Sequence, residues 1–176
     1  MTPLASGVRR NLERKARHAD LSAARDTALR LGARFLADER QTDTYFQVAQ
    51  GRLKLREIEG QLAVLIAYDR PDAVEARLSR YYLVPVSDPA SLKAALTATL
   101  DVRGIVHKRR SIYLWHNVRI HLDEVEGLGK FVEFEAVLSP TDDEATAHDR
   151  LKELGKVLGL QEDDYFAPSY ADLLGF

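Results

Sequence analysis

The chain has 176 residues, 45% of them hydrophobic, with a net charge of −2 and no cysteine. These values predict one domain, residues 1–176, with a single packed core, and they exclude a disulfide framework and a thiolate metal site. No apolar run reaches the roughly 18 residues of a membrane-spanning helix, and the opening MTPLASGVRR lacks the apolar core of a signal peptide. We therefore expect a cytoplasmic protein that binds neither membrane nor nucleic acid.

The first predicted strand covers residues 8–17, and polar side chains occupy one of its faces. These side chains are Asn11, Glu13, Lys15 and Arg17. An amphipathic helix follows, with Asp20 or Ser22 as its cap and Gly32 as its end.

Four short strands are expected next, because alternating apolar residues are separated by glycine-containing turns. They cover residues 34–39, 42–48, 52–58 and 62–68. In the stretch RLKLRE of the third strand, Leu53 and Leu55 share one face, and the opposite face carries the basic residues Arg52, Lys54 and Arg56. This strand therefore has one cationic face.

The second half continues with strands at residues 76–86 and 106–115, the latter with Lys108 and Arg110 on one face. Between them, Asp88 and Pro89 begin a helix. Its predicted buried stripe consists of Leu92, Ala95, Leu96 and Leu100. A capping box of Thr141 and Glu144 is predicted to start a last long helix, which ends near Gly159.

A hairpin at residues 118–135, VRIHLDEVEGLGKFVEFE, organises the chain, because each of its strands has charge on one face. On the first strand these positions are Arg119, His121 and Asp123. On the second, Glu133 and Glu135 share a face with Phe131, whereas Val132, Phe134 and Ala136 form an apolar face. Two adjacent carboxylates repel each other, so they require a cationic partner, either in solvent or in a bound metal facing basic side chains.

Summed over the strands, the polar faces hold nine basic and four acidic residues, although the whole chain is slightly negative. The basic residues are Lys15, Arg17, Arg52, Lys54, Arg56, Arg70, Lys108, Arg110 and Arg119, and the acidic ones are Glu13, Asp123, Glu133 and Glu135. The charges on any single strand have an ordinary explanation, either as a face exposed to solvent or as an edge strand protected against aggregation. Together they favour an α+β fold, in which a closed antiparallel barrel has helices outside and a bound anion inside.

In order along the chain, these motifs resemble the CYTH family, also called triphosphate tunnel metalloenzymes. Residues 11–15, NLERK, are similar to the family's ExExK signature. The other marks are DTYF at 43–46, KLR at 54–56, YDRPD at 68–72, HKRR at 107–110, DEVEGLGKFVEFE at 123–135 and SYADLL at 169–174. The resemblance implies a closed eight-stranded antiparallel β-barrel, the triphosphate tunnel, with helices packed outside.

The resemblance also implies roles for the residues in the tunnel. Lys15, Arg56, Glu133 and Glu135 are expected to be catalytic. Substrate phosphates are expected at Lys15, Arg17, Lys54, Arg56, Arg70, Lys108, Arg110 and Arg119. Mg²⁺ or Mn²⁺ is expected at Glu13, Asp123, Glu133 and Glu135. Asn11 departs from the signature, which has glutamate there, and an amide brings no negative charge to a metal.

Three functions stay open at this point. The first is metal-dependent cleavage of a triphosphate, by attack of water on the terminal phosphorus. The second is a class IV adenylate cyclase, in which the ribose 3′-hydroxyl attacks the α-phosphorus of ATP and pyrophosphate leaves. The third is a module that binds polyphosphate or nucleotide without catalysis. The expected partner is a small molecule that carries a triphosphate, and the expected assembly is a monomer or a homodimer.

Overall fold

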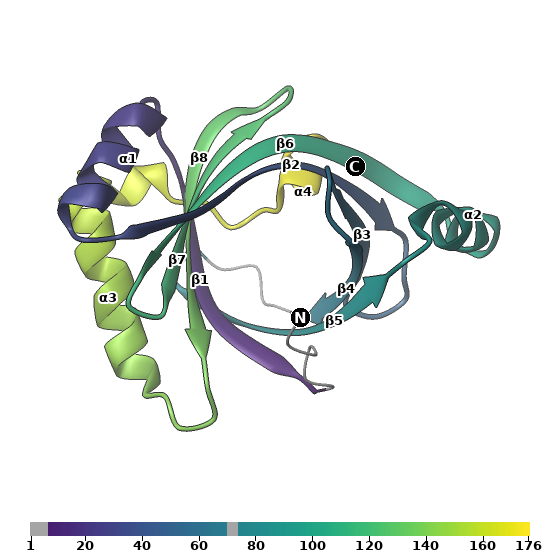
Figure 1. Cartoon of the computed structure of the whole chain (residues 1–176), viewed down its shortest axis with the longest axis horizontal. Coiled ribbons are helices and arrows are strands. Elements are labelled where there is room, and N and C mark those ends of the chain that lie inside the picture. The colour runs from purple at the N-terminus through teal and green to yellow at the C-terminus, as the bar shows by residue number, and fades with distance from the viewer. Residues whose placement is uncertain (1–6, 70–73) are drawn as a thin grey trace.

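Eight strands pair antiparallel and close into a barrel in the computed structural model, which describes residues 7–69 and 74–176 (Figure 1). Around the barrel their order is β1-β5-β4-β3-β2-β6-β7-β8. The strands are β1 (Arg9–Arg17), β2 (Arg34–Phe46), β3 (Arg52–Ile58), β4 (Ala63–Asp69), β5 (Arg77–Val86), β6 (Val102–Trp115), β7 (Val118–Val125) and β8 (Gly129–Leu138). The prediction of a closed antiparallel barrel of eight strands with helices outside is confirmed.

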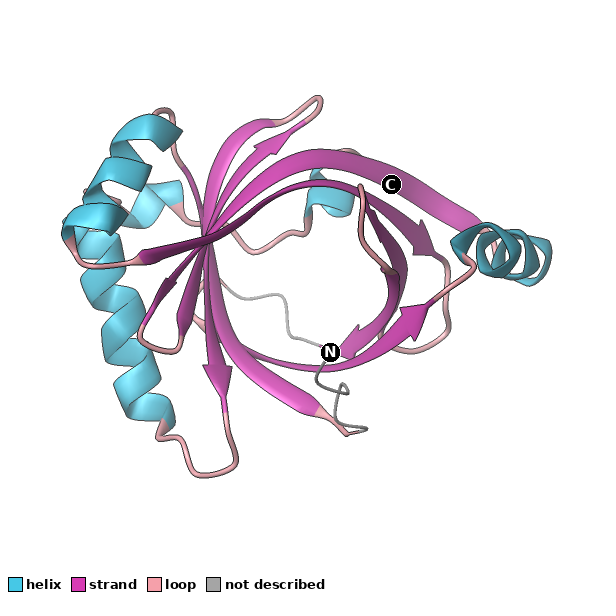
Figure 2. Cartoon of the chain, viewed as in Figure 1, coloured by secondary structure: helices cyan, strands magenta, loops and turns pink. Residues whose placement is uncertain are grey.

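The helices are α1 (Leu21–Arg30), α2 (Pro89–Thr99), α3 (Glu144–Val157), the 3₁₀ turn η1 (Glu162–Asp164) and the short α4 (Tyr170–Leu173). The longer helices lie outside the barrel, α1 and α3 on one side and α2 on the other, whereas the short α4 lies between these sides (Figure 2). Helices α1 and α3 pack on β7 and β8, whereas α2 packs on β3 across the barrel (Figure 1). Among the described residues, no helix is long and apolar enough to cross a membrane.

The largest core lies between α1, α3 and the outer face of β1, β7 and β8. The apolar face predicted for the last strand is part of it, since Val132, Phe134 and Ala136 are all at most 1% exposed. From α3, Leu151 and Leu154 pack into the same cluster. Burying a large apolar side chain contributes about 1.5–3 kcal/mol, so this core fixes which face of each strand points outward.

Two predicted boundaries differ from the structure. Residues 34–39 and 42–48 were expected as separate strands, but β2 runs unbroken over 13 residues because it pairs with β6 along nearly its whole length. The last long helix is capped by Asp143, whose carboxylate accepts from the Ala145 and Thr146 amides, so the predicted Thr141 capping box is wrong.

The stripe predicted for α2 is only partly buried. Leu92, Leu96 and Leu100 pack against the small cluster of Phe46, Leu55, Ala63 and Val86, but no residue of this helix is fully buried. Its start is as expected, because the Asp88 carboxylate accepts from the Ser91 amide and Pro89 takes the first helical position. The helix thus covers one flank of the barrel without a deep core of its own.

Candidate functional site

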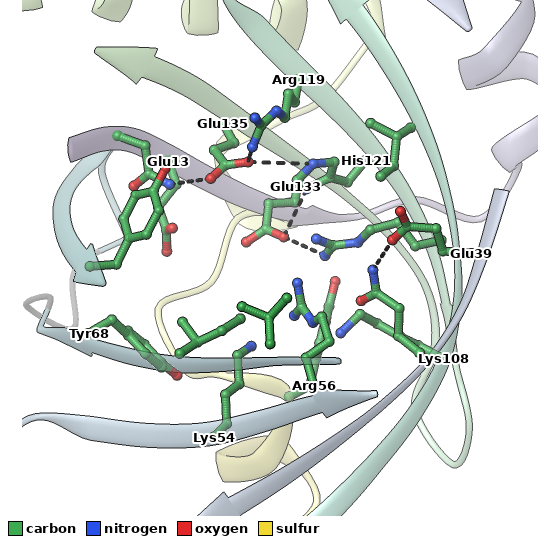
Figure 3. Close-up of a pocket in the computed structure, with 18 of the residues that line it drawn as sticks. Glu13, Glu39, Lys54, Arg56, Tyr68, Lys108, Arg119, His121, Glu133 and Glu135 are labelled. Carbon is green, nitrogen blue, oxygen red and sulfur yellow. Dashed lines mark hydrogen bonds and ion pairs between the residues drawn. The ribbon is translucent and has the colours of Figure 1, made fainter. Parts of the chain in front are cut away.

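Side chains from all eight strands converge on a cavity of about 410 Å³ inside the barrel. Alternation along each strand sends the apolar faces out to the helices, so the polar faces must meet inside. Six basic and four acidic side chains are among the described residues that line the cavity. They are Lys15, Lys54, Arg56, Lys108, Arg110 and Arg119, with Glu13, Glu39, Glu133 and Glu135. Figure 3 shows Lys54 and Arg56 on the wall opposite Glu133 and Glu135.

Asp43 holds three of these cations together. Lys54 Nζ and Lys108 Nζ each lie 2.9 Å from its Oδ2, and Arg56 binds both carboxylate oxygens at 2.7 Å. The Asp43 side chain is fully buried. It comes from β2, where Gln41 and Tyr45 share its inward face. One carboxylate cannot neutralise three cations, so this wall of the cavity keeps an excess of positive charge.

Burial and mutual repulsion act on the ionisation of this wall. Burial raises the pKa of Asp43, but the charges of Arg56, Lys108 and Lys54 outweigh it and hold the pKa well below the usual value. Burial lowers the pKa of Lys108 to about 8, even though Asp43 opposes the change. Burial and the neighbouring Arg56 likewise lower the pKa of Lys54 well below its usual value. An anion that entered the cavity would favour the charged forms of both lysines.

The opposite wall carries two carboxylates on β8 with His121 between them. The Glu133 carboxylate lies 2.7 Å from Arg110 Nη2, 3.4 Å from His121 Nδ1 and 3.6 Å from Lys15 Nζ. Glu135 lies 3.6 Å from His121 Nε2 and 3.3 Å from Arg119 Nη1. Burial raises the pKa of Glu133, but Lys15 and Arg110 reverse this and lower it well below normal. Both carboxylates are therefore anionic at neutral pH, because the pKa of Glu135 is also lowered, with His121 and Arg119 outweighing its burial.

Two residues predicted for the tunnel do not line the cavity. Asp123 is fully buried, and its two oxygens accept from Arg110 at 2.6 Å each, with Tyr170 Oη 2.7 Å away. These bonds direct its carboxylate at Arg110, so Asp123 lies behind the cavity lining and holds the Arg110 guanidinium, which does line the cavity. Arg17 is exposed at the end of β1, where its guanidinium lies 5.4 Å from the Phe131 ring centroid. Arg70 falls outside the described residues.

The other predicted residues are brought together in one place. Lys15, Lys54, Arg56, Lys108, Arg110, Arg119, Glu13, Glu133 and Glu135 all line the cavity. Arg52, counted on the same inward face, instead lies 3.4 Å from Asp172 near the C-terminal segment. Sequence reasoning did not assign Asp43, Glu39 or Gln41 to the site, although their spacing of two along one strand was a usable signal.

The C-terminal segment contributes part of the wall. Ser169 and Tyr170 line the cavity, and Lys15 Nζ lies 4.0 Å from the Tyr170 ring centroid. Tyr170 also packs with Tyr45, Val106 and Phe131 in a small buried cluster. The segment is therefore part of the site, and cation–π contact with its ring holds the Lys15 ammonium group.

Asn11 reaches the carboxylate wall from β1. Its side-chain nitrogen donates to Glu135, which leaves its carbonyl oxygen buried and without a hydrogen-bond partner in the described part of the chain. An unsatisfied buried acceptor costs about 1–3 kcal/mol. A cation or a hydrogen-bond donor placed in the cavity would remove this cost.

The oxygen donors on this wall suit Mg²⁺ or Mn²⁺. They are the carboxylates of Glu13, Glu133 and Glu135, together with the Asn11 carbonyl oxygen. Within residues 7–69 and 74–176, no three His, Asp or Glu side chains form a ready-made metal cluster. Mg²⁺ ordinarily uses one or two carboxylates and completes its shell with phosphate oxygens and water, so this donor set fits an ion that binds together with a phosphate ligand.

Most of the chain is similar to known proteins. The sequence profile described as "CYTH domain" matches residues 9–170. An Aeromonas hydrophila protein named adenylate cyclase CyaB is 30% identical over 149 residues, covering 78% of this chain and 74% of that protein. A Methanocaldococcus jannaschii protein, MJ0240, which carries a provisional adenylate cyclase name, is 24% identical over 156 residues, covering 83% and 87%.

The fold is shared with solved structures. The PH1012 protein of Pyrococcus horikoshii superposes with a TM-score of 0.81 over 93% of this chain and 98% of that one, at 26% identity. A conserved hypothetical protein of Pyrococcus furiosus gives a TM-score of 0.78 at 23% identity, covering 93% and 99%. The similarity to these structures therefore extends over nearly the whole barrel and its helices.

Proposed function

The chain belongs to the CYTH domain family, and from that premise we propose that it binds a triphosphate-bearing anion in the cavity and cleaves one of its phosphoanhydride bonds with Mg²⁺ or Mn²⁺. One observation carries the proposal. Six cationic side chains from four strands surround one cavity, while three carboxylates and an amide oxygen lie on the wall across from Lys54 and Arg56. A polyanion and a divalent cation together match both walls.

The basic residues would bind and orient the phosphates. Arg56 and Arg110 are already held as flat forks by Asp43 and Asp123, so their remaining N–H groups keep a fixed direction. A guanidinium fork matches phosphate oxygens in bidentate fashion, whereas Lys15, Lys54 and Lys108 act as compact charges. A ligand held by these groups would already have its phosphates oriented for attack, so little additional entropy would be lost when the transition state forms.

The carboxylate wall would organise the reacting end. Glu13, Glu133 and Glu135 would hold the ion, with the Asn11 carbonyl oxygen as a neutral fourth donor. When bound, a divalent ion neutralises charge that develops on the phosphoryl oxygens and polarises the phosphorus under attack. His121 lies between Glu133 and Glu135 and would fix the positions of the two carboxylates.

In hydrolysis, water attacks the terminal phosphorus, the bond from that phosphorus to the bridging oxygen breaks, and the proton of the water passes to a carboxylate or to solvent. Cyclisation is the second candidate, because both curated relatives described above bear adenylate cyclase names. There the ribose 3′-hydroxyl would attack the α-phosphorus and pyrophosphate would leave. The same cations and carboxylates serve both reactions, which differ in the nucleophile.

Binding is tested by thermal unfolding with tripolyphosphate or ATP. A ligand that binds only the folded state raises stability by about 2.7 kcal/mol at 100 times its Kd. The double substitution Lys54→Ala with Arg56→Ala should abolish the rise in Tm, and Arg40→Ala with Arg109→Ala, which removes two exposed cations of neighbouring strands, should leave it intact. A full rise in the first double variant contradicts binding in the cavity.

Product analysis then separates the three functions. Phosphate released from tripolyphosphate or ATP in the presence of Mg²⁺ or Mn²⁺ supports the triphosphatase. Cyclic AMP and pyrophosphate formed in equal amounts support the cyclase. A protein that is stabilised by both ligands and forms none of these products is a binding module, and catalysis would then have to be given up.

A further inference from the structure

One side chain of the C-terminal segment, Tyr170, reaches the cavity wall and is held there from several directions. It begins α4, which packs on β6 (Figure 1), and it is 4% exposed. In the capping box of this helix, the Asp172 carboxylate accepts from the Ser169 amide at 2.8 Å, and Arg103 of β6 donates to the same carboxylate at 2.5 Å. The centroid of the Tyr170 ring also lies 5.0 Å from that of Phe131. The side chain therefore has a fixed position relative to the barrel.

The Tyr170 hydroxyl controls the direction of Arg110 through a buried carboxylate. It donates to Asp123 Oδ2 at 2.7 Å, and the two Asp123 oxygens accept from Arg110 Nε and Nη2 at 2.6 Å each. Burial raises the pKa of Tyr170 well above its ordinary value, so the hydroxyl keeps its proton and stays a donor. The two bonds between Asp123 and Arg110 fix only their mutual orientation. Without the hydroxyl, the carboxylate and the guanidinium would be able to turn together.

The face of the same ring holds Lys15. The Nζ atom of Lys15 lies 4.0 Å from the Tyr170 ring centroid and 3.6 Å from Glu133 Oε1, and this side chain is 5% exposed. A lysine ammonium is a compact charge on a flexible stem, so its position in a cavity depends on the groups that surround it. An aromatic face attracts a cation through its quadrupole and carries no net charge. Unlike a second carboxylate, the ring therefore fixes Lys15 without repelling an incoming anion.

We propose that Tyr170 is a positioning residue of the cavity, whose hydroxyl fixes Arg110 through Asp123 and whose ring face fixes Lys15. The inference rests on the proposed function, because it assigns both cations to the phosphates of the ligand. One rigid side chain thereby sets the separation of two cations that come from different strands, β1 and β6. A ligand that bridges these cations would find them already in place, which lowers the entropy lost on binding.

A role as a core residue alone makes a different prediction. Tyr170 packs in a small buried cluster with Tyr45 and Phe131, so a substitution there also lowers stability. Loss of packing would weaken ligand binding to the same extent whichever cations are present. Positioning acts through Arg110 and Lys15, so its loss should have no effect once the partner cation is replaced.

The test is a double-mutant cycle on the affinity for tripolyphosphate, measured by calorimetry with Mg²⁺ present. Tyr170→Phe keeps the ring and removes only the hydroxyl, so it should weaken binding about fivefold in the otherwise wild-type protein. In the Arg110→Lys background the same change should have less than about a twofold effect, because a lysine cannot use the fork that Asp123 holds. An equal loss in both backgrounds overturns the inference in favour of packing.

The ring is tested by Tyr170→Leu in comparison with Tyr170→Phe. Loss of the ring face should weaken binding by a further factor of about five. This further loss should vanish in the Lys15→Met background, and a loss that persists there overturns the role assigned to the ring. Tyr82→Leu is the matched control and should keep the wild-type affinity, because Tyr82 is 51% exposed and lies on β5 outside the cavity lining.

The Tyr170→Phe comparison decides the inference even if Tyr170→Leu does not fold, because it removes a single oxygen atom. A wild-type protein that binds tripolyphosphate no more tightly than Tyr170→Phe does overturns this inference and leaves the proposed function standing. A wild-type protein that does not bind tripolyphosphate at all overturns the proposed function itself, since that probe depends on the cations of the cavity.

Discussion

Asp43→Asn should be strongly destabilising in the absence of an anion. The substitution removes the one negative charge that lies 2.7–2.9 Å from Lys54, Arg56 and Lys108, at a position with no solvent exposure. Removing one partner of a buried ion pair costs about 3–5 kcal/mol, because the remaining charge is left uncompensated. For a chain of this size that corresponds to a fall in Tm of roughly 6–20 °C.

The same substitution should make stability depend more strongly on an anion. Tripolyphosphate would supply the missing negative charge, so its stabilising effect should be larger in Asp43→Asn than in the wild-type protein. The assay is thermal unfolding in low salt with and without tripolyphosphate. Asp38→Asn is the control, since Asp38 is an exposed residue of the same strand whose ion pair with Arg109 is 3.8 Å long and solvated.

The outcome that refutes this reasoning is a ligand-free Asp43→Asn protein with the Tm of the wild type. It would mean that the cations are neutralised in another way, either by loss of protons from the lysines or by solvent ions, and that Asp43 does not hold the wall together. A second outcome is a destabilised Asp43→Asn protein whose Tm rises with tripolyphosphate by only as much as that of the wild type. It would contradict the idea that the anion replaces the missing charge, and it would leave the stabilising role of Asp43 in place.

Three further predictions follow from the charges in the cavity. Between pH 8 and about 10.5 the unfolded chain binds a proton at Lys108 that the folded chain has lost, so this residue makes the unfolding free energy rise with pH. Tripolyphosphate binding should weaken over the same range. Urea unfolding of Lys108→Met should show a smaller increase of the unfolding free energy with pH than the wild type. Glu133→Gln should keep tripolyphosphate binding and lower phosphate release or cyclic AMP formation by a factor of about 10² or more, and an equal loss of binding would assign Glu133 to the ligand site alone. Asn11→Glu adds a negative charge where the unpartnered oxygen lies, so the Mg²⁺ concentration for half-maximal activity should fall. Lower activity at every Mg²⁺ and Mn²⁺ concentration would mean that the amide itself is needed. No change in metal dependence would place Asn11 away from the metal.

Local rules predicted much of the site because alternation along a strand is a local property. The basic face of β3 and the paired carboxylates of β8 follow from the two-residue repeat, and the structure places Lys54, Arg56, Glu133 and Glu135 around one cavity. The same alternation puts Asp43 on one face with Glu39 and Gln41, but it cannot show that this carboxylate holds three cations together. A single carboxylate in a strand reads as an ordinary surface residue until the partners that surround it are known.

The register of neighbouring strands decided what each charge does. Asp123 was predicted as a metal ligand, but pairing with Arg110 across β6 and β7 turns its carboxylate toward that guanidinium. Arg17 shares its strand face with Lys15, yet it is exposed because it stands at the end of β1. Cross-strand partners lie far apart in sequence, so periodicity alone carries no information about them.

By itself, the sequence determined most of the strands, most of their inward faces and the excess of basic charge on them, because each depends on residues close together in the chain. The tertiary structure alone decided the rest. Closure of the barrel through β1, with β5 and β8 as its neighbours, brings the two walls face to face and unites residues separated by more than 100 positions. It also leaves the carbonyl oxygens of Asn11 and Gln41 buried without a partner, since whether an acceptor is satisfied depends on every element packed around it.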